Sequence, residues 1–154
     1  MPRVQATFLV EARPEAVWSV LTNPNFIPKL YPDILNAVAS PPGAAVVGQW
    51  RTMSGRLGQR LFEFRTKVEE LVPMKRFVIG GRRGGAFESF RQVMELTSVK
   101  EGTMVSGLFE FTVSQDYFGP QFDITLLNQA ASLNEENYMM NLKELAELHD
   151  PGSG

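Results

Sequence analysis

Apolar and polar residues alternate along much of the chain, and this period of two predicts β-strands. In residues 3–11, every second residue from Val4 to Val10 is apolar, while the residues between them are mostly polar. Residues 59–71 alternate over their whole length, so one face of this strand contacts water. Short turns separate consecutive strands, which makes these neighbours antiparallel. The remaining predicted strands are 34–40, 46–53, 75–81, 86–99 and 103–113.

Three other segments have helical character. After Arg13, the residues from Pro14 to Thr22 carry apolar side chains at helical spacing, and they predict a short helix. Residues 23–34 contain three prolines among apolar residues, so we expect no more than one or two helical turns there. Residues 122–148 lack proline and glycine and predict one long helix of about 40 Å. Its apolar stripe consists of Leu127, Ala131, Asn134, Tyr138, Leu142 and Leu145.

The order of these elements is one strand, two short helices, six strands and one long helix, which indicates an α+β fold. The sheet has an apolar face that needs a cover, and only the C-terminal helix is long enough to provide one. We therefore predict a curved antiparallel sheet of seven strands wrapped around that helix. No repeat or linker divides the chain, so residues 1–154 form a single domain, with 150–154 as a frayed tail.

Composition excludes several kinds of chemistry. The chain has no cysteine and a single histidine, His149, so it has the residues for neither a thiolate zinc site nor a two-histidine metal motif. We expect no metal and no cofactor. The net charge of −2 argues against nucleic acid as a partner. No apolar run approaches the length of a membrane helix or a signal peptide, which predicts cytoplasmic residence and no transmembrane segment.

Six short motifs follow one another along the chain. They are ARPEAVWSVLTNPNF at 12–26, LYPDI at 30–34, VGQW at 47–50, VEELVPMKRF at 68–77, GTMVSGLFEF at 102–111 and NLKELAE at 141–147. Through their order and spacing, more than through any single motif, the chain resembles the START-like (SRPBCC) helix-grip superfamily, which includes polyketide cyclase/dehydrase and lipid-transport-like proteins. The resemblance implies a helix-grip fold and a cavity between sheet and helix that holds a lipophilic molecule.

The alternation and the helical stripe select the side chains expected to line such a cavity. The alternative is that these side chains close-pack and leave no cavity. If Trp50 faces the helix, its neighbour Arg51 faces solvent. The candidate ligand-binding residues are Trp50, Phe62, Phe64, Phe90, Met94, Phe109, Phe111, Leu127, Ala131, Asn134 and Tyr138.

Few polar residues could carry chemistry in this interior. Asn134 and Tyr138 lie on the buried stripe of the helix, so each needs a partner in the backbone, in water or in a ligand. Glu88 and Gln92 share the parity of Phe90 and could point inward, although a solvated strand end fits Glu88 better. Glu88, Tyr138 and Asn134 are weak catalytic candidates. Arg82 and Arg83 fit a solvated hairpin tip.

A proline-interrupted apolar segment, with Phe26, Ile27, Leu30 and Tyr31, is expected at the cavity mouth. It could form a gate, a landing surface or a hydrophobic plug. Our leading hypothesis is a binding protein for a lipid, isoprenoid or polyketide-like molecule rather than an enzyme. The alternatives are a cyclase/dehydrase-like enzyme acting by confinement, and a protein that binds a partner through the 26–31 segment. The oligomeric state is left open.

Overall fold

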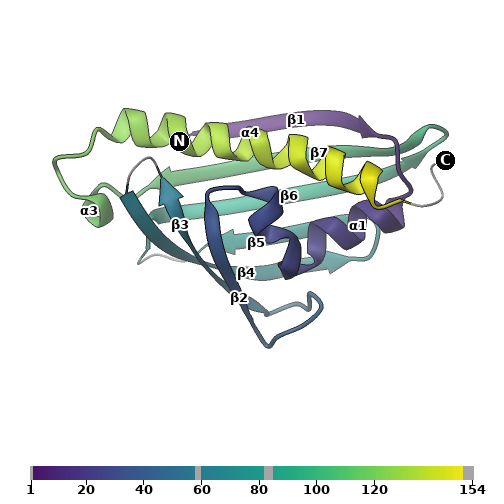
Figure 1. Cartoon of the computed structure of the whole chain (residues 1–154), viewed down its shortest axis with the longest axis horizontal. Helices are drawn as coiled ribbons and strands as arrows, with labels where there is room; N and C mark the ends of the chain where they lie inside the picture. The colour runs from purple at the N-terminus through teal and green to yellow at the C-terminus, as the bar shows by residue number, and fades with distance from the viewer. Residues whose placement is uncertain (1, 58–59, 82–84, 151–154) are drawn as a thin grey trace.

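A single antiparallel sheet forms the framework of the protein (Figure 1). The computed structural model describes residues 2–57, 60–81 and 85–150. Within them, seven strands are ordered β1-β7-β6-β5-β4-β3-β2, which confirms the predicted sheet. The strands are β1 (Arg3–Val10), β2 (Ile34–Ser40), β3 (Trp50–Leu57), β4 (Arg60–Val72), β5 (Arg76–Gly81), β6 (Phe87–Val99) and β7 (Gly102–Val113).

The long C-terminal helix, α4, lies across one face of this sheet (Figure 1). The Asp123 side chain accepts a hydrogen bond from the Thr125 backbone N–H and begins the helix, two residues later than predicted. The short α3 had no predicted counterpart. The predicted helix-grip fold is confirmed. The helical segments are α1 (Pro14–Thr22), η1 (Pro24–Phe26), α2 (Ile27–Leu30), α3 (Gln115–Phe118) and α4 (Ile124–Leu148).

Contact between α4 and the sheet depends on a small residue at the centre of β7. Gly107 faces α4, and a Cβ atom at this position would lie 2.9 Å from Met139 Sδ and 3.1 Å from Met94 Sδ. The two methionines therefore occupy the space that any larger residue at position 107 would need. The adjacent helix residue, Tyr138, packs its ring edge-on against Phe109, with the ring centroids 5.5 Å apart.

The connection between β1 and β2 has to cross the whole sheet. β1 pairs with β7 at one edge, whereas β2 forms the other edge. The intervening segment, which holds α1 and α2, lies on the same side of the sheet as α4 (Figure 1). As a result, the C-terminus of α1 and the residues after α2 lie over the face of the sheet that α4 covers.

The third strand differs from its prediction at both ends. Residues 46–49 form a turn, in which the Gln49 N–H donates to the Val46 carbonyl and Gly48 has a φ of 91°, so β3 begins at Trp50. The strand then continues through Ser54 and Gly55, where a turn was expected. Gly55 is needed for close packing, because a Cβ atom there would collide with the backbone of Asp33.

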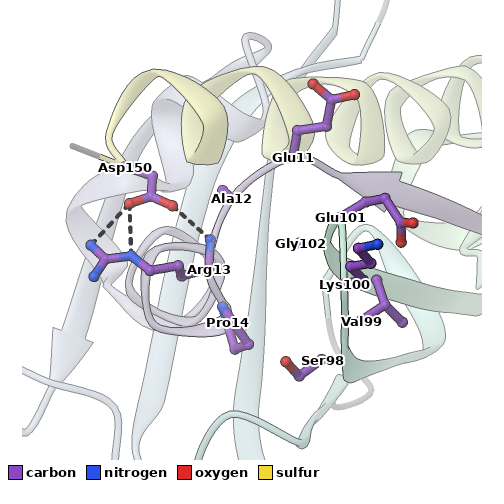
Figure 2. A pocket seen from close by; sticks show the side chains of 10 residues that line it. All are labelled: Glu11, Ala12, Arg13, Pro14, Ser98, Val99, Lys100, Glu101, Gly102 and Asp150. Atoms are coloured by element: carbon purple, nitrogen blue, oxygen red, sulfur yellow. Dashed lines mark hydrogen bonds and ion pairs between the residues drawn. The ribbon is translucent and has the colours of Figure 1, made fainter. Parts of the chain in front are cut away.

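The end of α4 is tied to the start of α1. Asp150, expected to begin a frayed tail, is only 5% exposed. Its carboxylate accepts hydrogen bonds from the Arg13 backbone N–H at 2.7 Å and from Arg13 Nε at 3.0 Å (Figure 2). The remaining tail residues, 151–154, lie outside the described residues.

Removal of the Asp150 carboxylate should lower stability. We expect Asp150→Ala to reduce the free energy of unfolding by about 1–3 kcal/mol, because the charged acceptor of Arg13 is lost. Glu144→Ala, which changes an exposed side chain on the same helix, should stay within about 0.5 kcal/mol of the wild type. Urea unfolding followed by circular dichroism measures both, and equal midpoints for the two variants would contradict this role of Asp150.

Candidate functional site

The structure buries most of the side chains that were predicted to line the interior. Nine of the candidate side chains are buried between the sheet and α4, and Asn134 is partly buried beside them. Phe87, which was not a candidate, joins the group and packs against the rings of Phe64, Phe90 and Phe111. The buried candidates are Phe62, Phe64, Phe90, Met94, Phe109, Phe111, Leu127, Ala131 and Tyr138.

A small cavity remains among these aromatic rings. Its volume is about 20 Å³, which is room for about one water molecule. Around this cavity the described side chains therefore leave only a water-sized space. The cavity is lined by Tyr31, Asp33, Ile34, Phe62, Phe64, Phe87, Ala131, Asn134 and Glu135.

A buried carboxyl group forms part of this cavity wall. Glu135 lies on the inner stripe of α4, is 3% exposed and accepts a hydrogen bond from the Tyr31 hydroxyl. Burial raises the pKa of Glu135 to about 8, although the hydrogen bond from Tyr31 acts in the opposite direction. Burial and the neighbouring Glu135 both raise the pKa of Tyr31. At neutral pH the pair therefore holds a proton on the carboxyl and another on the phenol.

A buried guanidinium group lies on the inner face of β3. Arg51 is 3% exposed, and its Nη2 donates to the Thr22 carbonyl at the end of α1 at 2.6 Å. Its Nε donates to Gln49 Oε1 at 3.1 Å, and the guanidinium carbon lies 5.3 Å from the centre of the Phe77 ring. Burial lowers the pKa of Arg51 to about 10, so the side chain remains a cation at neutral pH.

Two further polar atoms in the interior lack a hydrogen-bond partner among the described residues. Thr66 Oγ1 and Gln92 Nε2 are buried and form no hydrogen bond with any described residue. Thr66 is the cross-strand partner of Arg51, and the inward position of Gln92 agrees with its parity. Burial raises the pKa of Tyr138 above its ordinary value, while Gln92 and the Arg51 charge oppose the shift. The interior thus contains several polar side chains among its aromatic rings.

The predicted position of Trp50 was wrong. Trp50 lies on the outer face of the sheet, where its ring centre is 4.6 Å from the Arg65 guanidinium carbon and 5.5 Å from Lys67 Nζ. These cation–π contacts hold the indole outside while Arg51 takes the inner position. Glu88 is exposed, which agrees with the solvated strand end expected for it, because a bulge at Phe87–Ser89 reverses the parity at the start of β6 and turns Phe87 inward.

Sequence reasoning also missed Glu135, although a signal for it existed. Its position is four residues after Ala131 and three before Tyr138, which places it within the buried stripe. A charged residue in an apolar stripe needs a buried partner, and LYPDI supplies Tyr31. No similar signal identified Arg51, since its carbonyl partner is Thr22 on a separate element.

The expected cavity mouth is mostly part of the core. Ile27 and Leu30 are buried, so the 26–31 segment offers little apolar surface to a partner protein. Phe26 is partly buried and packs edge-on against His149, with centroids 5.5 Å apart. Of these four residues, Tyr31 lines the cavity. Arg82 and Arg83 lie outside the described residues.

A wider depression of about 500 Å³ opens where α4 ends, between the start of α1 and the β6–β7 turn (Figure 2). Its wall is polar, with Glu11, Lys100 and Glu101 alongside the Arg13–Asp150 ion pair. Among the described residues, no cluster of carboxylate and imidazole groups could hold a metal ion. Nor does any helix in the described part of the chain combine the length and apolarity needed to cross a membrane.

Comparison with known proteins agrees with this geometry. A family model described as polyketide cyclase/dehydrase and lipid transport matches residues 1–149. No curated protein matches the sequence. Solved structures of other proteins share the fold at less than 25% identity, and three of them are the following.

The Zhui aromatase/cyclase of a Streptomyces species has a TM-score of 0.78 at 13% identity, over 99% of this chain and 97% of that one. TTHA0849 from Thermus thermophilus has a TM-score of 0.71 at 16% identity, over 94% and 97% of the two chains. Ara h 8.0201 has a TM-score of 0.70 at 10% identity, over 94% and 96%.

The raised pKa of Glu135 predicts a pH-dependent stability. Between about pH 4.5 and pH 8 the folded protein keeps a proton that the unfolded chain releases, so stability is greatest at low pH and falls as pH rises. Relative to Glu135→Gln, which stays neutral, the wild type should lose about 1 kcal/mol per pH unit across this range. Urea unfolding between pH 5 and pH 9 measures the difference.

Glu136→Gln is the matched control, because Glu136 is the exposed neighbour on the same helix. Its stability should run parallel to that of the wild type at every pH. A constant difference between wild type and Glu135→Gln from pH 5 to pH 9 would show that Glu135 is ionised throughout and would contradict the prediction.

Proposed function

The chain belongs to the polyketide cyclase/dehydrase and lipid transport family, a START-like group, and from this we propose that it binds a hydrophobic small molecule between its sheet and α4. The molecule is a lipid, isoprenoid or polyketide-like compound. The observation that carries the proposal is an aromatic-lined cavity whose wall includes the buried Tyr31–Glu135 pair. Ligand sites typically combine an apolar wall with a few polar anchors of this kind.

Binding requires the interior to open, since the present cavity holds no more than about one water molecule. One wall of the cavity, at Tyr31 and Asp33, belongs to the segment between α2 and β2 rather than to the sheet. This wall is the part of the enclosure that can move without breaking strand pairing. We propose that it swings outward on ligand entry and that Phe62, Phe64 and Phe87 then contact the ligand. Cytoplasmic residence remains a prediction from the sequence.

Filling the cavity should abolish binding. We expect the wild type to bind the neutral fluorophore N-phenyl-1-naphthylamine at one saturable site. Ala131→Leu, which enlarges a buried wall residue, should weaken this binding at least tenfold. Gln129→Leu adds the same side chain at an exposed position of α4 and should leave the affinity unchanged. Fluorescence titration measures all three, with circular dichroism to verify folding.

Native mass spectrometry of the protein purified from its own host provides an independent check. A bound hydrophobic molecule is expected in the wild type and not in Ala131→Leu. A protein that is ligand-free from its host and also fails to bind the fluorophore would refute the proposal. Equal affinity in Ala131→Leu and wild type would refute the placement of the ligand.

A cyclase/dehydrase-like enzyme is the second candidate, and the Tyr31–Glu135 pair favours it. A buried carboxyl group with a pKa of about 8 can give or take a proton at neutral pH. The pair also lines the cavity, where a confined chain would meet it. This assignment replaces the exposed Glu88 as acid or base.

On this candidate, Glu135→Gln should slow turnover of a poly-β-ketone thioester by about 100-fold or more, because the proton-transferring group is lost. Tyr31→Phe should also slow it, while Glu136→Gln should not. Product formation followed by liquid chromatography and mass spectrometry measures the rates. If Glu135→Gln turns over at the wild-type rate, the pair has no catalytic role.

A further inference from the structure

The inner face of the sheet presents an unusual concentration of hydrogen-bond donors. The Arg51 cation is buried there, and no carboxylate of the described residues lies within 4.0 Å of it, since the ion pairs found involve other residues. Two of its nitrogens donate to neutral acceptors, the Thr22 carbonyl and the Gln49 amide oxygen. A buried charge is normally paired with an opposite charge, so this cation is incompletely compensated.

The surroundings of Arg51 supply only partial negative charges. Thr22 is the last residue of α1, and a helix C-terminus carries a partial negative charge. The face of the Phe77 ring, 5.3 Å away, adds a weak cation–π attraction. The buried carboxyl group of this interior, Glu135, is hydrogen-bonded to Tyr31 and retains its proton. None of these neighbours neutralises the charge of Arg51.

The neighbouring side chains point to the chemistry of the missing partner. Thr66, directly opposite Arg51 in the β3–β4 register, is 0% exposed, and its hydroxyl has no partner among the described residues. Gln92 is 1% exposed, and its Nε2 makes no hydrogen bond of good geometry within the described part of the chain, although the side chain lies close enough to the Tyr138 hydroxyl to lower the pKa of that group. A guanidinium, an amide N–H and a hydroxyl on one face of the sheet together suit an acceptor oxygen that carries negative charge.

We propose that the ligand of this protein is a hydrophobic carboxylic acid whose carboxylate is received by Arg51, with Gln92 and Thr66 as additional donors. This inference rests on the proposed function. A carboxylate matches the planar guanidinium in geometry and supplies the opposite charge that the interior lacks. The Tyr31 ring lines the cavity and packs against the Tyr138 ring, with the ring centroids 4.6 Å apart. Tyr138 in turn interacts electrostatically with the Arg51 charge. The two tyrosines thus connect the aromatic cavity, which takes the apolar tail, with the site of the carboxylate.

The test compares two ligands that differ only at the polar end, dodecanoic acid and 1-dodecanol, by displacement of N-phenyl-1-naphthylamine at pH 7.4. We expect the wild type to bind the acid at least tenfold more tightly than the alcohol. Arg51→Gln should lose at least tenfold in affinity for the acid and less than threefold for the alcohol. Arg65→Gln removes an arginine from the outer face of the same sheet and should behave as wild type.

A readout in the unmodified protein keeps the proposal testable even if Arg51→Gln fails to fold. The carboxyl ¹³C resonance of bound, labelled dodecanoate should remain that of the ionised form at pH values where the acid in water is already protonated. Gln92→Leu should weaken binding of the acid severalfold while preserving affinity for the alcohol.

The outcomes separate the two proposals. Equal affinity of the wild type for acid and alcohol, or a bound carboxyl that titrates as in water, overturns the carboxylate assignment and leaves hydrophobic binding intact. Failure of both ligands and of the fluorophore overturns both proposals. Retention of the acid preference in folded Arg51→Gln overturns the role of Arg51, since a purely structural arginine that caps α1 would not set this preference.

Discussion

Close contact between α4 and the inner face of the sheet is the constraint on which the rest of the structure depends. Gly107 admits Met139 and Met94 at the centre of this contact, and Phe109 and Tyr138 continue it. Because water is excluded from the layer between helix and sheet, every polar group placed there must find a partner inside. The same exclusion raises the pKa of Glu135 and lowers that of Arg51.

The position of those polar groups follows from topology. β1 and β2 occupy opposite edges of the sheet, so the segment that joins them passes over the interior on the side of α4. It brings the Thr22 carbonyl to Arg51 and the Tyr31 hydroxyl to Glu135. One crossing connection thus supplies partners to both buried ionisable side chains, from the end of α1 and from the residue after α2. The mobile wall required for ligand entry would belong to this same connection.

The sequence predicted which residues share a buried face of one helix or strand better than it predicted contacts between different elements. Alternation in 59–71 and the helical stripe of 122–148 identified Phe62, Phe64 and Tyr138, because each pattern depends on backbone geometry alone. The choice between Trp50 and Arg51 depended instead on Thr22 and Lys67, residues distant in sequence that hydrophobicity does not reveal. Phe87 was overlooked because a bulge shifts parity locally, and Glu135 was overlooked because a charge usually marks the solvated face of a helix.

The two buried ionisable groups differ in what they demand of a ligand. Glu135 avoids the cost of burial by keeping its proton, whereas Arg51 cannot lose its charge at neutral pH. The interior is therefore cationic rather than neutral. Tyr138 is within electrostatic reach of both groups, so Arg51 and Glu135 belong to one water-excluded layer. A carboxylate held by Arg51 would supply the charge that this layer lacks, whereas Glu135 needs no partner beyond Tyr31 while it keeps its proton.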